Sequence, residues 1–239
     1  MNRLPGWACL SILVLWCAAF PVLAGDTDRY TRVRGSPDGI GKTYFGREIA
    51  HVMTYHGAAW LERPERAAQE QTDRIVAALE LTPGMTVADI GAGSGYYTWR
   101  AAQRVGPTGT VYAVDVQPEM LKLLEAQMSR RRISNVKSVP GTATDPRLPA
   151  DSLDVAFMVD VYHEFEFPYE MLGALVRSLK PGGRLVFVEY RANDPNVQIK
   201  PLHTMSEAQV KKEASAQALE WVKSVTTLPL QNVIVFRKK

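Results

Sequence analysis

A glycine-rich turn near residue 90 constrains the fold of this chain more than any other segment. Residues 87–98 read VADIGAGSGYYT: an apolar run that carries an acid, then three alternating glycines, then a helix-like continuation. In α/β proteins, a strand, a tight glycine turn and a helix in this order hold a nucleotide-like ligand at the helix N-terminus. The spacing G-x-G-x-G differs from the dinucleotide fingerprint G-x-G-x-x-G. The segment therefore predicts a nucleotide-like ligand without favouring a dinucleotide.

Strand-like and helix-like segments alternate from residue 85 onward. The expected strands are 85–90, 110–114, 136–139, 153–159 and 184–189. The expected helices between them are 96–105, 118–130 and 167–179. This alternation predicts an α/β fold with a doubly wound, mostly parallel sheet and right-handed crossovers. A helix at 205–218 and an antiparallel pair, 219–228 with 232–236, are expected to complete a seven-stranded sheet.

The segment before the sheet is expected to form a helical cap. Residues 26–47 are polar and glycine-rich, which favours an extended lead-in. Between residues 46 and 80, the triplets Ile49/Val52/Met53 and Ile75/Val76/Leu79 both follow the i, i+3, i+4 spacing of a helix. The predicted organisation is a lead-in and cap over 25–80 and a ligand-binding domain over 81–239.

The N-terminus has the pattern of a secretory signal peptide. Arg3 precedes an apolar run over residues 7–20, and the small residue Ala24 ends a small-x-small site that begins at Val22. Residues 1–24 are therefore predicted to be cleaved, and the protein to be exported to the periplasm or secreted. The alternative is an uncleaved membrane anchor, but the run is shorter than the ~20 apolar residues that a spanning helix needs.

Composition excludes several kinds of site. The two cysteines, Cys9 and Cys17, both lie in the predicted signal peptide, so residues 25–239 can form no disulfide, thiolate nucleophile or cysteine zinc site. The formal net charge is +3, which is too balanced to predict a nucleic-acid partner. The four histidines show no H-x-x-x-H or H-E-x-x-H spacing, so no metal site is expected.

The cofactor site is expected to be built around the glycine turn and the next strand end. The backbone of Gly91, Ala92, Gly93 and Gly95 allows a ligand to approach closely, and Asp89 could accept from a ligand ammonium. Asp115 ends the second strand, 20 residues after Gly95, where an acid can accept both hydroxyls of a ribose. Val116 and Met120 would flank the base. The alternative role for Asp115 is to cap the following helix.

Later strand ends supply further candidates. Thr142 and Ala143 follow the third strand and are candidate contacts to the cofactor; Asp145 is either a contact to the nucleobase or a turn residue. The fourth strand leads into Asp160, Tyr162, His163 and Glu164, of which Asp160 is a candidate both for cofactor binding and for catalysis. His163 is the candidate base for an acceptor hydroxyl or amine, with Asp160 beside it. The alternative is that His163 only supports the loop or caps a helix. The further candidates for substrate contact are Tyr44, His56, Tyr162 and Glu189. His203, in a long loop after the fifth strand, is a candidate for the wall of the substrate site.

These motifs together resemble the class I S-adenosylmethionine (SAM) dependent methyltransferases. The run D-x-G-x-G-x-G over residues 89–95 is similar to motif I of that family, and residues 158–165 resemble its motif IV. Strings at 60–66, 160–165 and 228–232 resemble exported bacterial methyltransferase-like proteins, a resemblance that names no acceptor. In the family, an acid commonly follows the third strand and binds the adenine amino group. Thr142 stands there instead, so that contact differs in this chain.

The resemblance implies methyl transfer from SAM to an acceptor nucleophile. It implies that SAM is the cofactor, and a small molecule with an oxygen or nitrogen nucleophile is the expected acceptor. No Asn-Pro-Pro-Tyr motif follows the fourth strand, which argues against methylation of a nucleobase or an amide. Because SAM is made in the cytosol, the alternative is an exported module that binds SAM or a nucleotide without catalysis.

Overall fold

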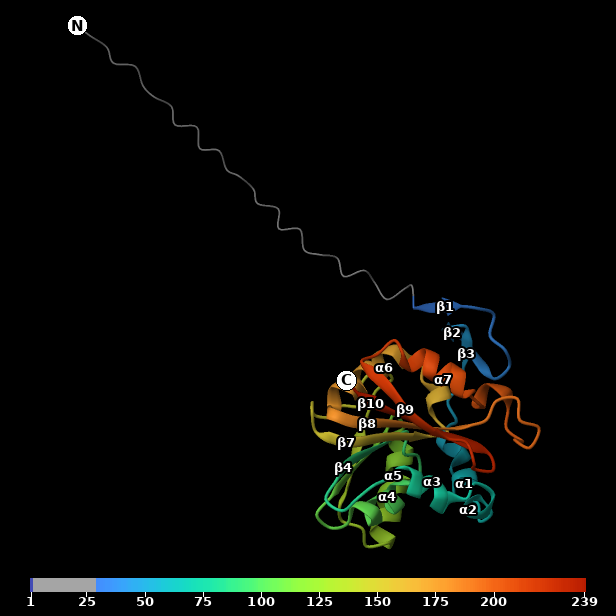
Figure 1. Ribbon diagram of the computed structural model, residues 1–239, viewed down its shortest axis with the longest axis vertical. Coiled ribbons are helices and arrows are strands. Elements are labelled where there is room, and N and C mark those ends of the chain that lie inside the picture. Colours follow the sequence, from blue (N-terminus) through green and yellow to red (C-terminus); the bar gives the residue numbers. More distant parts are fainter. Residues whose placement is uncertain (2–28) are drawn as a thin grey trace.

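The computed structural model describes Met1 and residues 29–239 (Figure 1). The predicted signal peptide, apart from Met1, lies outside the described residues. Within them, no helix is both long and apolar enough to cross a membrane.

A seven-stranded sheet forms the centre of the protein, with strand order β6-β5-β4-β7-β8-β10-β9. The strands are β4 (Thr86–Ile90), β5 (Thr110–Asp115), β6 (Val136–Pro140), β7 (Leu153–Val159), β8 (Leu179–Tyr190), β9 (Leu219–Val225) and β10 (Gln231–Lys238). Pairs among β4 to β8 are parallel. Strand β10 runs antiparallel to both β8 and β9. The predicted doubly wound sheet with an antiparallel C-terminal strand is confirmed.

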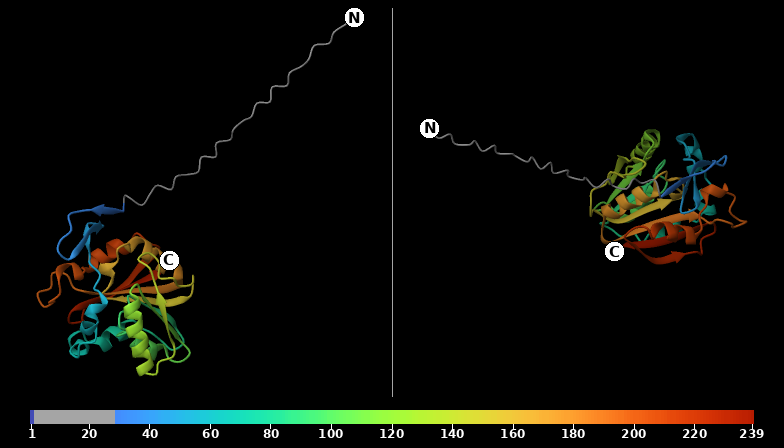
Figure 2. Two further views of the ribbon diagram at one scale, coloured as in Figure 1. Left: turned by 180° about the vertical axis from the view of Figure 1, so that it is seen from behind. Right: turned by 90° about the horizontal axis from the view of Figure 1, so that it is seen from above.

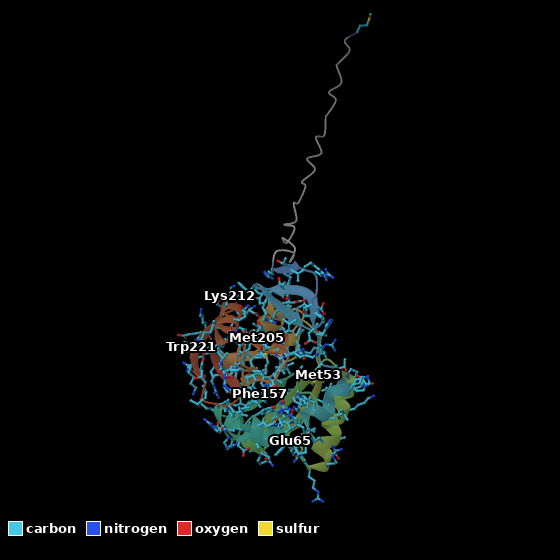
Figure 3. The ribbon with its side chains drawn as sticks, turned by 90° about the vertical axis from the view of Figure 1, so that its right-hand side faces the viewer. Met53, Glu65, Phe157, Met205, Lys212 and Trp221 are labelled. Atoms are coloured by element: carbon cyan, nitrogen blue, oxygen red, sulfur yellow. The ribbon has the colours of Figure 1, made fainter. Side chains whose placement is uncertain are left out.

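Helices cover both faces of this sheet because side chains alternate along its strands. The helices are α3 (Thr72–Ala78), α4 (Thr98–Val105), α5 (Pro118–Arg130), α6 (Pro168–Ser178) and α7 (Glu207–Ala214). On β7, Ala156 and Met158 pack with α6 and α7, whereas Val155 and Phe157 pack with α3 and α4. Figure 3 shows Phe157 inside the molecule and Trp221, which is 47% exposed, at the outer edge on β9.

The N-terminal region differs from the prediction. In place of an extended lead-in and a helix, residues 30–50 form an antiparallel sheet of β1 (Tyr30–Arg32), β2 (Gly39–Tyr44) and β3 (Arg47–Ala50). Tyr44 pairs with Arg47, and the two residues between them, Phe45 and Gly46, both have positive φ angles. Two-residue hairpin turns require this conformation. The helical spacing at Ile49 was therefore misleading, whereas the helix predicted at Ile75 is confirmed as α3.

Two boundaries also differ. Helix α6 ends at Ser178, and β8 begins at once with Leu179, five residues before the predicted strand start at 184, so residues 180–183 lie within the strand. Helix α7 is shorter than the predicted 205–218, because Met205 instead forms a β-bridge with Arg191.

The carboxyl ends of the parallel strands face the N-terminal region. Strand β3 contacts the 3₁₀ turns η3 (Tyr162–Glu164), which follows β7, and η4 (Pro201–His203), which follows β8. Figure 1 shows β1–β3 and the helices α1 (Ala58–Leu61), α2 (Arg66–Gln69) and α3 on one side of the sheet. Figure 2 shows the same arrangement from behind and from above. Residues 29–80 therefore enclose the sheet edge where doubly wound folds bind ligands.

Candidate functional site

A cavity lies at the carboxyl ends of β4, β5, β6 and β7. Its lining includes most of the predicted cofactor residues: Gly91, Gly93, Asp115, Val116, Met120, Thr142, Ala143 and Asp160. We call this the cofactor cavity. Three predicted cofactor residues, Asp89, Ala92 and Gly95, do not line it.

The glycine turn is held close to the neighbouring loops. Gly91, Gly93 and Gly95 all have positive φ angles. The amides of Gly91 and Ala92 both donate to the carbonyl of Val114, at 2.8 and 2.9 Å. A Cβ on Gly91 would lie 2.4 Å from a methyl group of Val161. The turn therefore needs glycine at position 91 both for its backbone conformation and for space.

Asp115 supports the turn and faces the cofactor cavity. Its Oδ2 accepts from the amide of Gly93 at 2.9 Å, and its Oδ1 accepts from the amide of Gln117 at 2.8 Å. Burial raises the pKa of Asp115 above its ordinary value, despite these hydrogen bonds. Each carboxylate oxygen keeps a further acceptor position. The bond to Gln117 reaches only the N-cap residue of α5, so Asp115 holds the entry to this helix without being its cap, and its role toward a ribose stays a prediction.

Asp89 does not occupy the place predicted for it. Its side chain is buried, and its Oδ2 accepts from the hydroxyl of Thr98 at 2.7 Å. Burial raises its pKa to about 7. Side chains alternate between the two faces of a sheet along each strand, and this alternation directs the side chain of Asp89 into the protein. Asp89 is therefore placed to hold α4 against β4 and not to reach a ligand.

We expect the Asp89→Asn variant to be stabilised relative to wild type, increasingly so at higher pH. Folding raises the Asp89 pKa from 3.8 to about 7, so the folded state holds its proton more tightly and wild-type stability falls as the pH rises between these values. The asparagine oxygen can still accept from Thr98. Between pH 6 and pH 8, the difference in unfolding free energy should grow by about 1 kcal/mol. Urea unfolding of both proteins at pH 6 and at pH 8 measures this difference. A difference in unfolding free energy that does not change with pH contradicts the prediction.

Asp160 is the acid that remains available to a ligand. It has a φ of 54°, and its Oδ1 is buried without a hydrogen-bond partner in the described part of the chain. Its Oδ2 lies 3.7 Å from Nη2 of Arg66 and accepts from Gln231 at 3.3 Å. Burial and then the charge of Glu70 raise its pKa well above the ordinary value. An orphaned buried acceptor at a cavity wall marks a position where a ligand donor would be stabilised.

A second cavity adjoins the first. Both are lined by Val52, Met53, Leu61, Arg66, Asp160 and Glu164. The second is also lined by Asp38, His51, Trp60, His163, Tyr190, Lys200 and His203. We call it the acceptor cavity. Because six residues belong to both walls, a molecule in one cavity lies next to a molecule in the other.

The chain around Met53 separates the two cavities and is tied to both walls. The amide of Met53 donates to Oε1 of Glu164 at 3.1 Å, and its carbonyl accepts from Gln117 at 3.0 Å. The amide of Tyr55 donates to the same Gln117 side chain at 2.8 Å. Figure 3 shows Met53 between the N-terminal sheet and the helices that follow it. These bonds fix the position of the segment over the site.

A polar corner of the acceptor cavity contains His163, Glu164 and His203. Nδ1 of His163 lies 2.6 Å from Oε2 of the fully buried Glu189. Nε2 of His163 lies 3.2 Å from Nδ1 of His203, which is itself 3.3 Å from Oε1 of Glu164. His163 and His203, which are 40 residues apart along the chain, therefore lie next to each other in the structure. This removes the reason for which no metal site was expected.

Four residues predicted to contact substrate do not line either cavity. Tyr44 is buried among aromatic rings of Tyr30 and Phe45. Tyr162 is also buried, and its hydroxyl donates to Glu213 at 2.8 Å. His56 is exposed and stacks on Tyr55. Glu189 contacts the ring of His163 from the side away from the cavity through Oε2, and its Oε1 accepts from the amide of Tyr162 at 2.9 Å.

The remaining residues to be placed lie mostly in loops beside the two cavities. Thr142 lines the cofactor cavity, but its hydroxyl accepts from the amide of Asp145 at 3.0 Å. Asp145 lies outside the cavity and accepts from the amide of Arg147, so it is a turn residue. His203 is a cavity wall, as expected. Arg66 lines both cavities and was missed, because nothing in its local sequence distinguishes it from an exposed helical arginine.

The sequence of residues 81–232 matches the methyltransferase domain family. The chain belongs to this family. Its fold agrees with a SAM dependent methyltransferase from Aquifex aeolicus at a TM-score of 0.74 and 24% identity, over 79% of this chain and 100% of the other. The [4+2]-cyclase SpnF agrees at a TM-score of 0.61 and 16% identity, over 70% of this chain and 80% of the other.

Curated relatives match over part of the chain only. Nocamycin O-methyltransferase of Saccharothrix syringae is 31% identical over 47% of this chain and 40% of its own length. Protein-L-isoaspartate O-methyltransferase of Methanothrix thermoacetophila is 33% identical over 45% of this chain and 49% of its own length. The chain thus spans less than half of each of these relatives. The family membership rests on residues 81–232 and identifies no acceptor.

Proposed function

We propose that this methyltransferase binds SAM in the cofactor cavity and moves its methyl group to a small molecule held in the acceptor cavity. The observation that carries the proposal is the shared wall of the two cavities, with Asp160 on it. Methyl transfer needs the acceptor nucleophile and the methyl carbon in contact and in line, and two adjoining cavities supply this proximity.

The residues of the cofactor cavity fit SAM. Asp115 offers a free acceptor position on each carboxylate oxygen for the ribose hydroxyls. The unpaired Oδ1 of Asp160 is a suitable acceptor for the ammonium of the methionine part. Val116 and Met120 give an apolar surface for the adenine. SAM would supply an electrophilic methyl group on a sulfonium.

The acceptor class follows from the second cavity. Its wall combines the aromatic and apolar side chains of Trp60, Val52 and Leu61 with the polar corner. Such a lining suits a small molecule with an apolar body and one oxygen or nitrogen nucleophile. During transfer the sulfur–methyl bond breaks, the new bond forms on the nucleophile, and the nucleophile's proton leaves toward the corner of His163, Glu164 and His203. The products are the methylated acceptor and S-adenosylhomocysteine.

Isothermal titration of the purified protein with SAM and S-adenosylhomocysteine tests the cofactor assignment. We expect one equivalent of each to bind. A panel of phenols, carboxylic acids and amines, assayed for S-adenosylhomocysteine release, then tests turnover. Absence of SAM binding contradicts the whole proposal. Binding without turnover on any acceptor favours a non-catalytic binding module or a different reaction, as the structural likeness to a [4+2]-cyclase illustrates.

We also propose that residues 1–24 direct export of the protein. Arg3, the apolar run and the small residues at 22 and 24 support this. Protein recovered from outside the cytosol should begin at Gly25. Recovery of the protein only in the cytosol, with Met1 intact, contradicts it.

A further inference from the structure

We infer that His163, Glu164 and His203 form a binding site for one divalent transition-metal ion in the wall of the acceptor cavity. The ligand atoms are Nε2 of His163, a carboxylate oxygen of Glu164 and Nδ1 of His203. The inference is carried by the mutual distances of these atoms and by the buried carboxylate behind His163.

The three ligand atoms have the separations that a common metal ion requires. Nδ1 of His203 lies 3.2 Å from Nε2 of His163 and 3.3 Å from Oε1 of Glu164, and the third distance is 3.9 Å. With metal–ligand bonds of 2.0 to 2.2 Å, ligand atoms around a tetrahedral zinc ion lie about 3.3 Å apart. The cluster needs little rearrangement to accept an ion of this size.

The buried carboxylate behind His163 leaves the inward nitrogen of that ring without a proton. The Glu189 carboxylate can only accept, so Nδ1 of His163 carries the proton in the neutral ring and Nε2 is bare. A carboxylate placed behind a ligating histidine in this way orients the ring and raises its basicity. Behind His203, Oδ2 of Asp38 lies 3.7 Å from Nε2, which is beyond hydrogen-bond distance.

The bare Nε2 of His163 faces Nδ1 of His203 at 3.2 Å, so either the Nδ1 proton of His203 or a bound cation lies between the two nitrogens. Within the part of the chain that the structure describes, the two histidines are the only basic side chains within ion-pair distance of Glu164. Lys200 pairs with Asp38 at 2.6 Å, and Arg47 pairs with Glu213 at 2.7 Å. The corner therefore offers negative charge and lone pairs that the neighbouring cations do not neutralise.

The donor set selects the class of metal. Two imidazoles and one carboxylate suit zinc, iron(II), cobalt or nickel, whereas magnesium and calcium prefer oxygen ligands. Three protein ligands leave a coordination position open, and all three residues line the acceptor cavity. If the proposed function holds, an acceptor hydroxyl could bind at that position, where the metal lowers its pKa and its proton leaves to solvent.

The ligands lie on two elements, and the supporting carboxylate lies on a third. His163 and Glu164 lie on η3, Glu189 on β8 and His203 on η4. The carbonyl of His163 also accepts from Nη1 of Arg47 at 3.1 Å. His163 and Glu164 are held by these contacts, whereas His203 lies on a surface loop. Replacement of His203 is therefore expected to disturb the fold least among the three ligands.

Titration of untagged full-length protein, first treated with a chelator, with Zn²⁺ tests the inference. We expect one equivalent to bind with a Kd below about 1 μM. The His203→Ala variant should bind at least ~100-fold more weakly, and Glu189→Gln, which acts through the orientation of His163, about 10–100-fold more weakly. His51→Ala is the matched control, because His51 lines the same cavity outside the cluster, and it should bind like wild type.

Two further measurements keep the outcome clear. Co²⁺ in the wild type should show the visible absorption of a four- or five-coordinate ion, and His203→Ala should lose it. The midpoint of thermal unfolding should rise with Zn²⁺ in wild type and His51→Ala but not in His203→Ala. Failure of stoichiometric binding, or equal binding by His203→Ala, overturns the metal site. SAM binding by the chelator-treated protein is scored separately, so the proposed function can stand when the metal site fails.

Discussion

Replacement of Gly91 by alanine is expected to destabilise the protein by about 2–5 kcal/mol and to abolish measurable SAM binding. The backbone at Gly91 has a φ of +69°, which costs an alanine roughly 1–2 kcal/mol. The new Cβ would also lie 2.4 Å from Val161, and overpacking of this kind costs about 1–3 kcal/mol. Val161 lines the cofactor cavity, so its displacement changes the place where the ligand binds.

Gly182→Ala is the matched control for this experiment. Gly182 has a φ of +74°, and a Cβ there would meet nothing within 4 Å. It should show the backbone penalty alone and leave SAM affinity unchanged. Chemical denaturation and SAM titration of both variants separate conformational strain from the contact with Val161. Equal losses in the two variants would show that Val161 yields and that the glycine is needed only for its conformation.

Asp115→Ala is expected to weaken SAM binding at least tenfold, and roughly 100-fold if both ribose hydroxyls bind the carboxylate. Hydrogen bonds to a charged group contribute about 1.5–3 kcal/mol each. The variant also removes the acceptor of the Gly93 amide, so the glycine turn loses a support. Titration with SAM measures the affinity, and urea unfolding measures the part that comes from the turn.

Asp145→Ala controls for the loss of an aspartate in this part of the fold. Like Asp115, Asp145 accepts from the amide two residues later, here Arg147 at 2.7 Å, but it does not line the cofactor cavity. Its removal should leave the SAM affinity within about threefold of wild type, because no ligand contact is lost. Unchanged affinity in Asp115→Ala would refute the ribose role and leave Asp115 as a structural residue.

The sheet and its ligand edge could be predicted because their signals are local. Apolar strands, the glycine turn and Pro118 at a helix start each report the conformation of their own segment, and the acid at position 115 follows from its place at a strand end. The N-terminal sheet could not be predicted from apolar spacing, because the hairpin depends on the positive φ of Phe45, a residue that rarely adopts it.

The arrangement of the candidate residues was missed because it depends on contacts between distant segments. His163 and His203 are separated by 40 residues, and only the fold of the loop after β8 brings them together. Asp89 has the sequence position of a ligand contact but is turned inward by the strand, while Asp160, with a positive φ, is turned toward the cavity. Side-chain direction at a strand end thus decides which of these two acids lines the cofactor cavity.

Two ion pairs join the N-terminal sheet region to segments far along the chain. Asp38 and Lys200 are 162 residues apart, and Arg47 and Glu213 are 166 apart. The residues that line the cofactor cavity all come before residue 172, whereas the lining of the acceptor cavity extends to His203. A chain that stalls or is truncated before η4 would therefore contain every residue that lines the cofactor cavity but would lack one wall of the acceptor cavity.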